Sequence, residues 1–250
     1  MIKELFDFKN KVIVVTGCSG HLGRAIVNFF IANNAKVYGL DIKKTKSSKN
    51  FTFLKCDLKN EKNCNSVIEY IYKQNKKINV FINNAAVSYF TFFEKRKLQE
   101  LNETISVNLF APFYFIKALQ KKSKKSHKLK IINISSIYGN ISPDFNIYSK
   151  GDRFNSEIYG ASKAGLQQMT KYFANLLASK NININCISPG GIKNYKVQKK
   201  TFIKKYLNKV PSKRLCETQD ILTAIAMFSS NYSNYITGQN LIIDGGLSLK

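Results

Sequence analysis

The chain has 250 residues, of which 44% are hydrophobic and 22% are charged, a composition typical of a folded globular protein. Forty Lys and Arg residues against 15 Asp and Glu give a formal net charge of +25. No apolar run approaches the roughly 20 residues that a membrane-spanning helix needs, and the first residues lack the layout of a secretory signal. The five cysteines form no CxxC motif, so we expect free thiols in a reducing cytoplasm and no metal site.

The positive charge alone would suit a nucleic-acid or other polyanionic partner. Arginine, the residue that binds phosphates bidentately, occurs only at positions 24, 96, 153 and 214, and lysine supplies the rest. The densest lysine run, 121–130, falls between an expected helix and an expected strand, where a solvated loop belongs. We therefore interpret the charge as a lysine-rich solvated surface and expect no nucleic-acid partner and no membrane partner.

Short β-branched apolar runs alternate with longer amphipathic segments along the chain. The runs predict strands over 12–16, 36–40, 51–54, 80–82, 131–134, 184–187 and 241–243. The longer segments predict helices over 22–33, 61–75, 97–120, 157–179 and 218–230. This alternation predicts a doubly wound (Rossmann) α/β fold, with one seven-stranded parallel sheet, helices on both faces and a single domain over residues 1–250. Residues 139–158 and 191–212 interrupt the alternation after strand ends, where open α/β sheets bind ligands, so we expect them to flank the substrate.

A glycine-rich turn, TGCSGHLG at 16–23, joins the first expected strand to a helix, as a dinucleotide-binding site requires. Gly17 would allow a tight turn, Gly20 close backbone approach and Gly23 helix–strand packing, so that the helix start could hold a pyrophosphate. Asp41 ends the second strand, 24 residues after Gly17 (41 − 17). A carboxylate there can accept both ribose hydroxyls and repels a 2′-phosphate, which predicts NAD rather than NADP. An aspartate that only caps the strand end remains the alternative.

Tyr159 and Lys163 are spaced i, i+4 near the start of an expected helix, which puts the phenol and the ammonium on one face. A nearby ammonium stabilises phenolate and lowers its usual pKa of about 10, as a general acid–base for an alcohol/ketone pair requires. A YxxxK motif alone is common. Here Ser135-Ser136 end the fifth expected strand and 83–86 the fourth, which places polar groups at the same edge of the sheet.

Together these motifs resemble the short-chain dehydrogenase/reductase family over nearly the whole chain. The matching segments are 16–23, Asp41, 56–58, 83–86, 107–108, 133–136, 159–163, 189–192 and 244–246. The resemblance implies hydride transfer between a nicotinamide cofactor and a secondary alcohol or ketone. It implies that Tyr159 is the catalytic acid/base, that Lys163 holds the nicotinamide ribose and lowers the pKa of the tyrosine, that Ser136 polarises the substrate oxygen, and that Asn108 anchors a water relay.

The same resemblance implies a cofactor site in which Asp57 contacts adenine, Asn84 lines the groove and Ile192 reaches the carboxamide through its backbone. The full set of cofactor-binding residues expected is Gly17, Ser19, Gly20, His21, Leu22, Gly23, Asp41, Asp57, Leu58, Asn84, Ala85, Tyr159, Lys163, Pro189, Gly190 and Ile192.

Three positions and the length of one interval depart from the family pattern. His21 occupies the usual middle-glycine slot, Ala86 replaces the glycine of NNAG, and Asn194 replaces a threonine expected at the nicotinamide loop. The interval from Ser136 to Tyr159 is 23 residues (159 − 136), which is longer than the family commonly shows. We expect this extra segment to lie over the active site.

The segment SSIYGNISPDF at 135–145, with the long interval after it and the PGGI motif, resembles a subgroup named for flagellin modification and surface-sugar biosynthesis. That resemblance implies a sugar, amino-sugar or nucleotide-sugar substrate. Cations at Lys150, Arg153, Lys193 and Lys196, in the two expected substrate loops, would suit an anionic sugar derivative.

Two other functions remain open. A 3-oxoacyl-[acyl-carrier-protein] reductase would use a basic surface to dock its acidic carrier, although such enzymes normally prefer NADPH, against which Asp41 argues. A catalytically silent cofactor-sensing or nucleic-acid-binding module would be expected to lose Tyr159 or Lys163, and both are present. The family's usual assembly implies a homodimer or homotetramer formed through the helices around 97–120 and 157–179.

Overall fold

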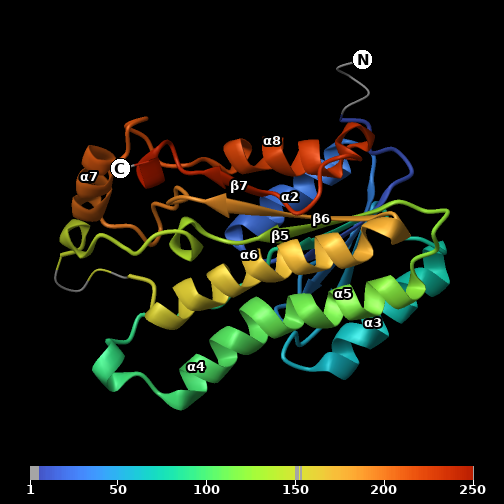
Figure 1. The fold of residues 1–250 in the computed structure, drawn as a ribbon, viewed down its shortest axis with the longest axis horizontal. Helices are drawn as coiled ribbons and strands as arrows, with labels where there is room; N and C mark the ends of the chain where they lie inside the picture. Colours follow the sequence, from blue (N-terminus) through green and yellow to red (C-terminus); the bar gives the residue numbers. More distant parts are fainter. Residues whose placement is uncertain (1–5, 150–151, 153, 250) are drawn as a thin grey trace.

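The computed structural model describes residues 6–149, 152 and 154–249. Seven parallel strands form one sheet in the order β3-β2-β1-β4-β5-β6-β7, which confirms the predicted fold class (Figure 1). The strands are β1 (Val12–Thr16), β2 (Lys36–Asp41), β3 (Phe51–Lys55), β4 (Val80–Asn83), β5 (Leu129–Ile134), β6 (Ile182–Pro189) and β7 (Asn240–Ile243). The strand order reverses between β1 and β4, and ligands of open parallel sheets bind outside the carboxyl ends at such a point.

Helices cover both faces of the sheet (Figure 1). The helices are α2 (His21–Ala32), α3 (Glu61–Asn75), α4 (Leu98–Ile105), α5 (Ala111–Lys122), α6 (Glu157–Leu177), α7 (Lys200–Lys209) and α8 (Thr218–Ser229). Apolar side chains of α2 and α8 form the core on one face, and those of α3, α5 and α6 form the core on the other. None of the helices in the described part of the chain is both long and apolar enough to cross a bilayer.

The continuous apolar run of β1 follows from burial on both sides. Ile13 and Val15 belong to the core under α2 and α8, whereas Val12 and Val14 belong to the core under α3 and α5. Because successive side chains of a strand point to opposite faces, only a strand covered on both sides reads as an unbroken apolar segment.

The prediction of one continuous helix over 97–120 is wrong in the middle of that range. A π-helical turn, Ser106–Phe110, separates α4 from α5, and it carries Asn108. A π turn inserts one extra residue without removing the amphipathic pattern, so the apolar spacing of the sequence gives no sign of it.

The two segments expected to be substrate loops are packed on each other at the carboxyl edge of the sheet. The segment predicted as a loop over 191–212 contains α7, and α7 packs on a short 3₁₀ turn, Phe145–Ile147, of the other segment (Figure 1). Ile147, Tyr206, Val210 and Leu215 form a small buried cluster between them. Two ion pairs, Asp144–Lys209 at 3.1 Å and Asp152–Lys199 at 3.3 Å, cross the same junction. The two loops therefore form one packed unit.

Candidate active site

The glycine turn has the shape that a bound pyrophosphate requires. Gly17 has a φ of +67°, and its N–H donates to the carbonyl of Leu40 at 2.8 Å. A Cβ on Gly23 would lie 2.0 Å from the Gly17 oxygen, so the helix can begin this close to the strand only with glycine there. A Cβ on Gly20 would meet only the Gly17 oxygen, at 3.2 Å, and otherwise open space. The backbone at the start of α2 is therefore accessible, as anion binding at a helix start requires.

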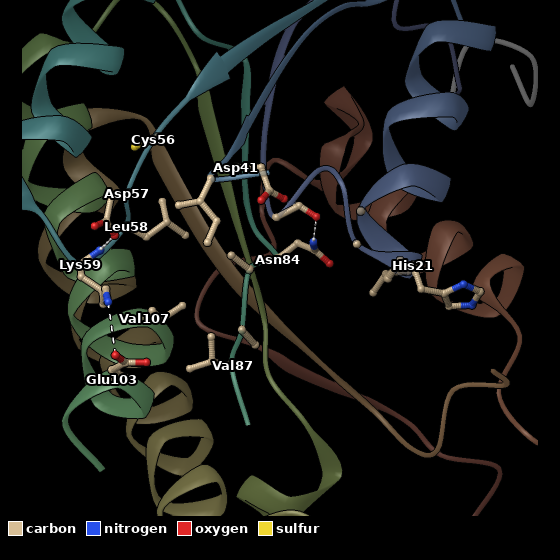
Figure 2. Close-up of a pocket in the computed structure, with 17 residues that line it drawn as sticks. His21, Asp41, Cys56, Asp57, Leu58, Lys59, Asn84, Val87, Glu103 and Val107 are labelled. Carbon is tan, nitrogen blue, oxygen red and sulfur yellow. Dashed lines mark hydrogen bonds and ion pairs between the residues drawn. The ribbon is translucent and has the colours of Figure 1, made fainter. Parts of the chain in front are cut away.

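Asn84, at the end of β4, holds the turn in place. Its Nδ2 donates to the carbonyl oxygens of Thr16 at 2.9 Å and Gly17 at 3.3 Å, and the Thr16 Oγ1 accepts the N–H groups of Asn84 and Ala85 at 3.0 Å each. Figure 2 shows the Asn84 amide directed at the turn. Asn84 lines the groove, as expected, and its amide also holds the glycine turn through these hydrogen bonds.

Asp41 lies at the rim of the same groove. Its carboxylate accepts the backbone N–H groups of Ser19 at 3.0 Å and Lys43 at 2.9 Å, so Ser19 acts on the site through Asp41 and does not itself line the cavity. The His21 imidazole is exposed and points away from Asp41 and Asn84 in Figure 2. Only the backbone of His21, at the helix start, is positioned to contribute to anion binding.

These residues enclose a cavity of about 430 Å³ beside the place where the strand order reverses, between β1 and β4. Asp57 and Leu58 form its far wall, opposite the glycine turn (Figure 2). The expected cofactor residues that line it are Gly17, Gly20, His21, Leu22, Gly23, Asp41, Asp57, Leu58, Asn84 and Ala85. The residues present therefore fit the adenosine and pyrophosphate part of a dinucleotide.

A second cavity of about 390 Å³ contains the groups expected to do chemistry. Ser136 at the end of β5, Tyr159 on α6, and Gly190 and Ile192 after β6 all line it. The Oγ of Ser156 caps α6 by accepting the N–H of Tyr159 at 3.3 Å, so the cap lies directly beside the candidate acid. Ser135 does not line this cavity, and its Oγ donates to the Lys163 carbonyl at 3.0 Å.

The hydroxyl of Ser136 is oriented by a backbone contact. Its Oγ accepts the N–H of Tyr138 at 3.2 Å, so its own proton can be donated to the Tyr159 oxygen or to a substrate oxygen. Burial raises the pKa of the half-buried Tyr159, and a hydrogen bond with Ser136 opposes that rise. The neutral phenol, which can donate a proton, is therefore the form that this site favours.

Lys163 lies beside Tyr159, as the i, i+4 spacing predicts, but its ammonium is directed at a backbone carbonyl. Its Nζ donates to the carbonyl oxygen of Ile134 at 2.8 Å and lies 5.7 Å from the centre of the Tyr159 ring. The side chain is buried, which lowers the pKa of the ammonium to about 8. The lowered pKa expected for Tyr159 is not what this arrangement produces, because burial disfavours the charged form of both groups and the ammonium is directed at a carbonyl.

Asn108 joins three elements. Its Oδ1 accepts the N–H of Val87 at 2.8 Å, and its Nδ2 donates to the Val87 carbonyl at 3.0 Å and to the Ser162 Oγ at 3.1 Å. The π turn is thereby tied to the segment after β4 and to α6. The Asn108 side chain therefore positions these elements. The water relay that the family resemblance implies for Asn108 remains a prediction.

The loop after β6 is held by a residue that the sequence analysis missed. Tyr206 on α7 is buried, and its hydroxyl accepts the N–H of Gly191 at 2.6 Å. The neighbouring Gly190 N–H donates to Ile243, while the Ile192 N–H has no acceptor among the described residues and is free for a ligand. Pro189 ends β6 without lining either cavity. The only sequence signal for Tyr206 was its apolar spacing within 200–209.

Of the four cations expected to gather an anionic substrate, the two that lie among the described residues do not line the cavity. Lys193 pairs with Glu217 at 3.1 Å and lies over the Tyr195 ring at 5.1 Å. Lys196 is exposed and, like Lys193, does not line the cavity of Tyr159. Lys150 and Arg153 lie outside the described residues. A different lysine, Lys199, lines the cavity and pairs with the buried Asp152.

The chain is similar to known proteins over almost its full length. Residues 19–248 match the family model described as enoyl-(acyl carrier protein) reductase. The 3-oxoacyl-[acyl-carrier-protein] reductase of Rickettsia typhi is 31% identical over 97% of this chain and 99% of the relative. The Escherichia coli reductase of the same name is 29% identical over 96% and 98%.

The chain is also similar to solved structures over almost its full length. A short-chain dehydrogenase from Leptospira borgpetersenii with bound NAD⁺ has a TM-score of 0.88 and 35% identity, covering 98% of this chain and 95% of that one. A 4-hydroxyisoleucine dehydrogenase complexed with NADH has a TM-score of 0.85 and 26% identity, covering 96% and 100%. Thermoplasma acidophilum aldohexose dehydrogenase has a TM-score of 0.84 and 28% identity, covering 98% and 96%.

The resemblance to the family as a whole is confirmed, whereas the surface-sugar subgroup finds no support, because the two curated relatives described above are named as acyl-carrier-protein reductases. The chain belongs to the short-chain dehydrogenase/reductase family, a family of NAD(P)-dependent oxidoreductases.

Proposed function

We propose that this protein is an NADH-dependent reductase of 3-oxoacyl thioesters carried on an acidic carrier protein. The observation that carries the proposal is the full-length similarity to 3-oxoacyl-[acyl-carrier-protein] reductases, together with Ser136 and Tyr159 facing one cavity. This substrate replaces the sugar derivative expected from the sequence. The net charge of +25 supports it as well, because a basic surface attracts an acidic carrier.

NAD(H) is the cofactor that these residues fit best. The open backbone at Gly20 and the start of α2 would hold the pyrophosphate, and Asp41 would accept ribose hydroxyls and repel the 2′-phosphate of NADPH. The free N–H of Ile192 would meet the carboxamide, and Lys163 the nicotinamide ribose. When bound, the cofactor supplies a hydride to the substrate's carbonyl carbon. Two structural neighbours contain NAD⁺ or NADH, in line with this choice.

The chain's own residues then handle the oxygen and the proton. The Ser136 hydroxyl, whose lone pair is used by the Tyr138 N–H, donates to the ketone oxygen and stabilises negative charge that develops there. Tyr159 donates its phenolic proton to the same oxygen, and its neutral form is the one favoured by burial. Lys163 near the phenolate left behind would stabilise it.

A free sugar or polyol is the second candidate substrate. Asp152, Asn155 and Gln198 bring polar groups into the cavity of Tyr159, and one structural neighbour is an aldohexose dehydrogenase. Such groups can hydrogen-bond hydroxyls, although each already has a partner in the protein: Asp152 accepts the N–H of Ser149 at 2.6 Å, Asn155 the hydroxyl of Ser88 at 2.8 Å and Gln198 the N–H of Asn194 at 2.8 Å.

A kinetic panel tests the proposal. We expect NADH oxidation with acetoacetyl-CoA, and a higher kcat/KM when the same acyl group is carried on an acyl carrier protein. A panel of aldoses and polyols with NAD⁺ is expected to be turned over at least a hundredfold less efficiently. Efficient aldose oxidation with no thioester reduction would replace the first candidate by the second.

We also propose that the chain forms a dimer through α5 and α6. Phe113 on α5 and Tyr172 on α6 are 38% and 63% exposed, and Phe110, at the end of the π turn before α5, is 46% exposed; all three line a groove that includes Gly165 and Met169. Burying such a surface would remove several large apolar side chains from water. Sedimentation of the wild type and of Phe113→Lys tests this: a dimer that dissociates in the variant is the expected result.

A further inference from the structure

Besides Phe90, four aromatic side chains in contact with one another form a wall of the cavity that contains Ser136 and Tyr159. They come from three segments and are Tyr138, Tyr148, Phe202 and Tyr206. The Tyr148 ring stacks on Phe202 with centroids 5.5 Å apart and an angle of 22°, and Phe202 lies 5.6 Å from Tyr206. The Tyr148 and Tyr138 hydroxyls are 2.8 Å apart. The Tyr148 ring is therefore held at both its face and its hydroxyl end.

Tyr148 belongs to the long interval between Ser136 and Tyr159, and that interval is fastened to α7. Its neighbour Ile147 is buried against Tyr206 and Val210. The Asp144–Lys209 and Asp152–Lys199 ion pairs close the same junction at 3.1 and 3.3 Å. Moving Tyr148 out of the cavity would expose Ile147 and break these contacts. The wall is consequently a fixed part of the site.

The space directly beside Ser136 and Tyr159 is small. The cavity measures about 390 Å³, near the lower end for small-molecule sites, and the nicotinamide must share it because Gly190 and Ile192 line it. A 3-oxoacyl thioester has two arms at its reacting carbon. The thioester arm must lead out to the carrier, so the alkyl arm is the one directed against the wall.

We propose that Tyr148 is a specificity-determining residue that limits the alkyl arm of the substrate to a short chain. This inference rests on the proposed thioester reductase function. The ring of Tyr148 and the Phe202 beneath it occupy the volume that a longer chain would need. The hydroxyl of Tyr148 serves to hold the ring against Tyr138.

The test is a chain-length series with NADH and the coenzyme A thioesters of acetoacetate, 3-oxooctanoate and 3-oxododecanoate. In the wild type, we expect kcat/KM to fall at least tenfold from the four-carbon to the eight-carbon substrate. Tyr148→Ala should raise the ratio of eight-carbon to four-carbon kcat/KM at least tenfold. Phe202→Ala, which removes the other half of the stack, should shift the ratio in the same direction. Tyr148→Phe is the matched control, because it keeps the ring, and its ratio should stay within threefold of the wild type.

Two results would overturn the inference. One is an unchanged chain-length ratio in Tyr148→Ala with NADH affinity retained, as measured by cofactor fluorescence. The other is a ratio shifted equally by Tyr148→Phe, which would make the hydroxyl and not the ring responsible. If Tyr148→Ala does not fold, Tyr148→Leu keeps apolar contact with Phe202 while shortening the wall and must show the same shift. Failure of the proposed function itself looks different: the wild type would then reduce no thioester of any length.

Discussion

The ammonium of Lys163 donates a hydrogen bond to the carbonyl oxygen of Ile134, the last residue of β5, at 2.8 Å. Lys163 is only 2% exposed, and the one hydrogen bond does not replace the hydration lost by burying its charge. The pKa of Lys163 is accordingly lowered to about 8.

The stability consequence is a pH dependence with a defined sign. Because the folded pKa of Lys163 lies below its unfolded value, the unfolded chain binds more protons between about pH 8 and 10.5, and this residue makes stability rise with pH there. A shift of this size corresponds to at most about 3 kcal/mol. Relative to the wild type, the free energy of unfolding of Lys163→Met should therefore be highest at pH 7, and this relative gain should be lost by pH 10. Urea unfolding at both pH values measures it.

Lys171→Met, at an exposed position of the same helix, is the control for that experiment and should follow the wild type at both pH values. An identical difference between Lys163→Met and the wild type at pH 7 and pH 10 would contradict the assignment of a lowered pKa to Lys163.

Removing the phenolic hydroxyl of Tyr159 should abolish proton transfer to the substrate oxygen. We expect Tyr159→Phe to lower kcat by about 10²–10⁴, the range typical of a general acid, with little change in NADH affinity. Tyr172→Phe, a 63% exposed tyrosine on α6, should keep full turnover. Steady-state kinetics and a cofactor-fluorescence titration check both variants, and a Tyr159→Phe enzyme with wild-type kcat would disprove the mechanism.

Two glycines of the cofactor turn should respond differently to an added methyl group. Gly23→Ala puts a Cβ 2.0 Å from the Gly17 oxygen and should cost about 3 kcal/mol of stability. Gly20→Ala meets only one atom, at 3.2 Å, so it should unfold within about 1 kcal/mol of the wild type. Its methyl group would enter the cavity, and NADH should bind at least tenfold more weakly. Equal effects of both variants on stability and on NADH affinity would refute this geometry.

Asp41 should determine the choice between NADH and NADPH through its charge. Asp41→Asn keeps an oxygen for the N–H groups of Ser19 or Lys43 but no longer repels a phosphate. We expect the ratio of kcat/KM for NADPH to that for NADH to rise at least tenfold. Asp57→Asn, which removes another carboxylate lining the same cavity, should leave this ratio unchanged. A wild type that already prefers NADPH would show that Asp41 does not select the cofactor.

The sheet and the cofactor turn could be predicted from the sequence because their signals are local. Strands buried on both faces, such as β1, read as continuous apolar runs. The turn at 16–23 depends on Gly17, which has a positive φ, and on Gly23, where a Cβ would clash with the Gly17 oxygen. The end of β2 at Asp41 follows from the same pattern.

The parts that escaped prediction depend on contacts between distant segments. The apolar residues of α7 (KTFIKKYLNK) alternate with lysines, so the sequence does not single out a buried face. The role of α7 follows only from the hydrogen bond between the Tyr206 hydroxyl and the Gly191 N–H. The direction of the Lys163 ammonium depends on the carbonyl of Ile134, which is 29 residues away. Helical spacing alone placed Tyr159 and Lys163 on one face, but it could not show how burial shifts each pKa.

The proposed function is that Tyr159 and Ser136 reduce the 3-keto group of an acyl thioester with hydride from NADH. Its most direct test is to incubate the protein with acetoacetyl-CoA and NADH that carries deuterium on both C4 positions, and to locate the label by mass spectrometry. We predict one deuterium on carbon 3 of the 3-hydroxybutyryl product with the wild type, and at least a hundredfold less labelled product with Tyr159→Phe. Absence of labelled product with the wild type, or equal labelling by Tyr159→Phe, would contradict the claim.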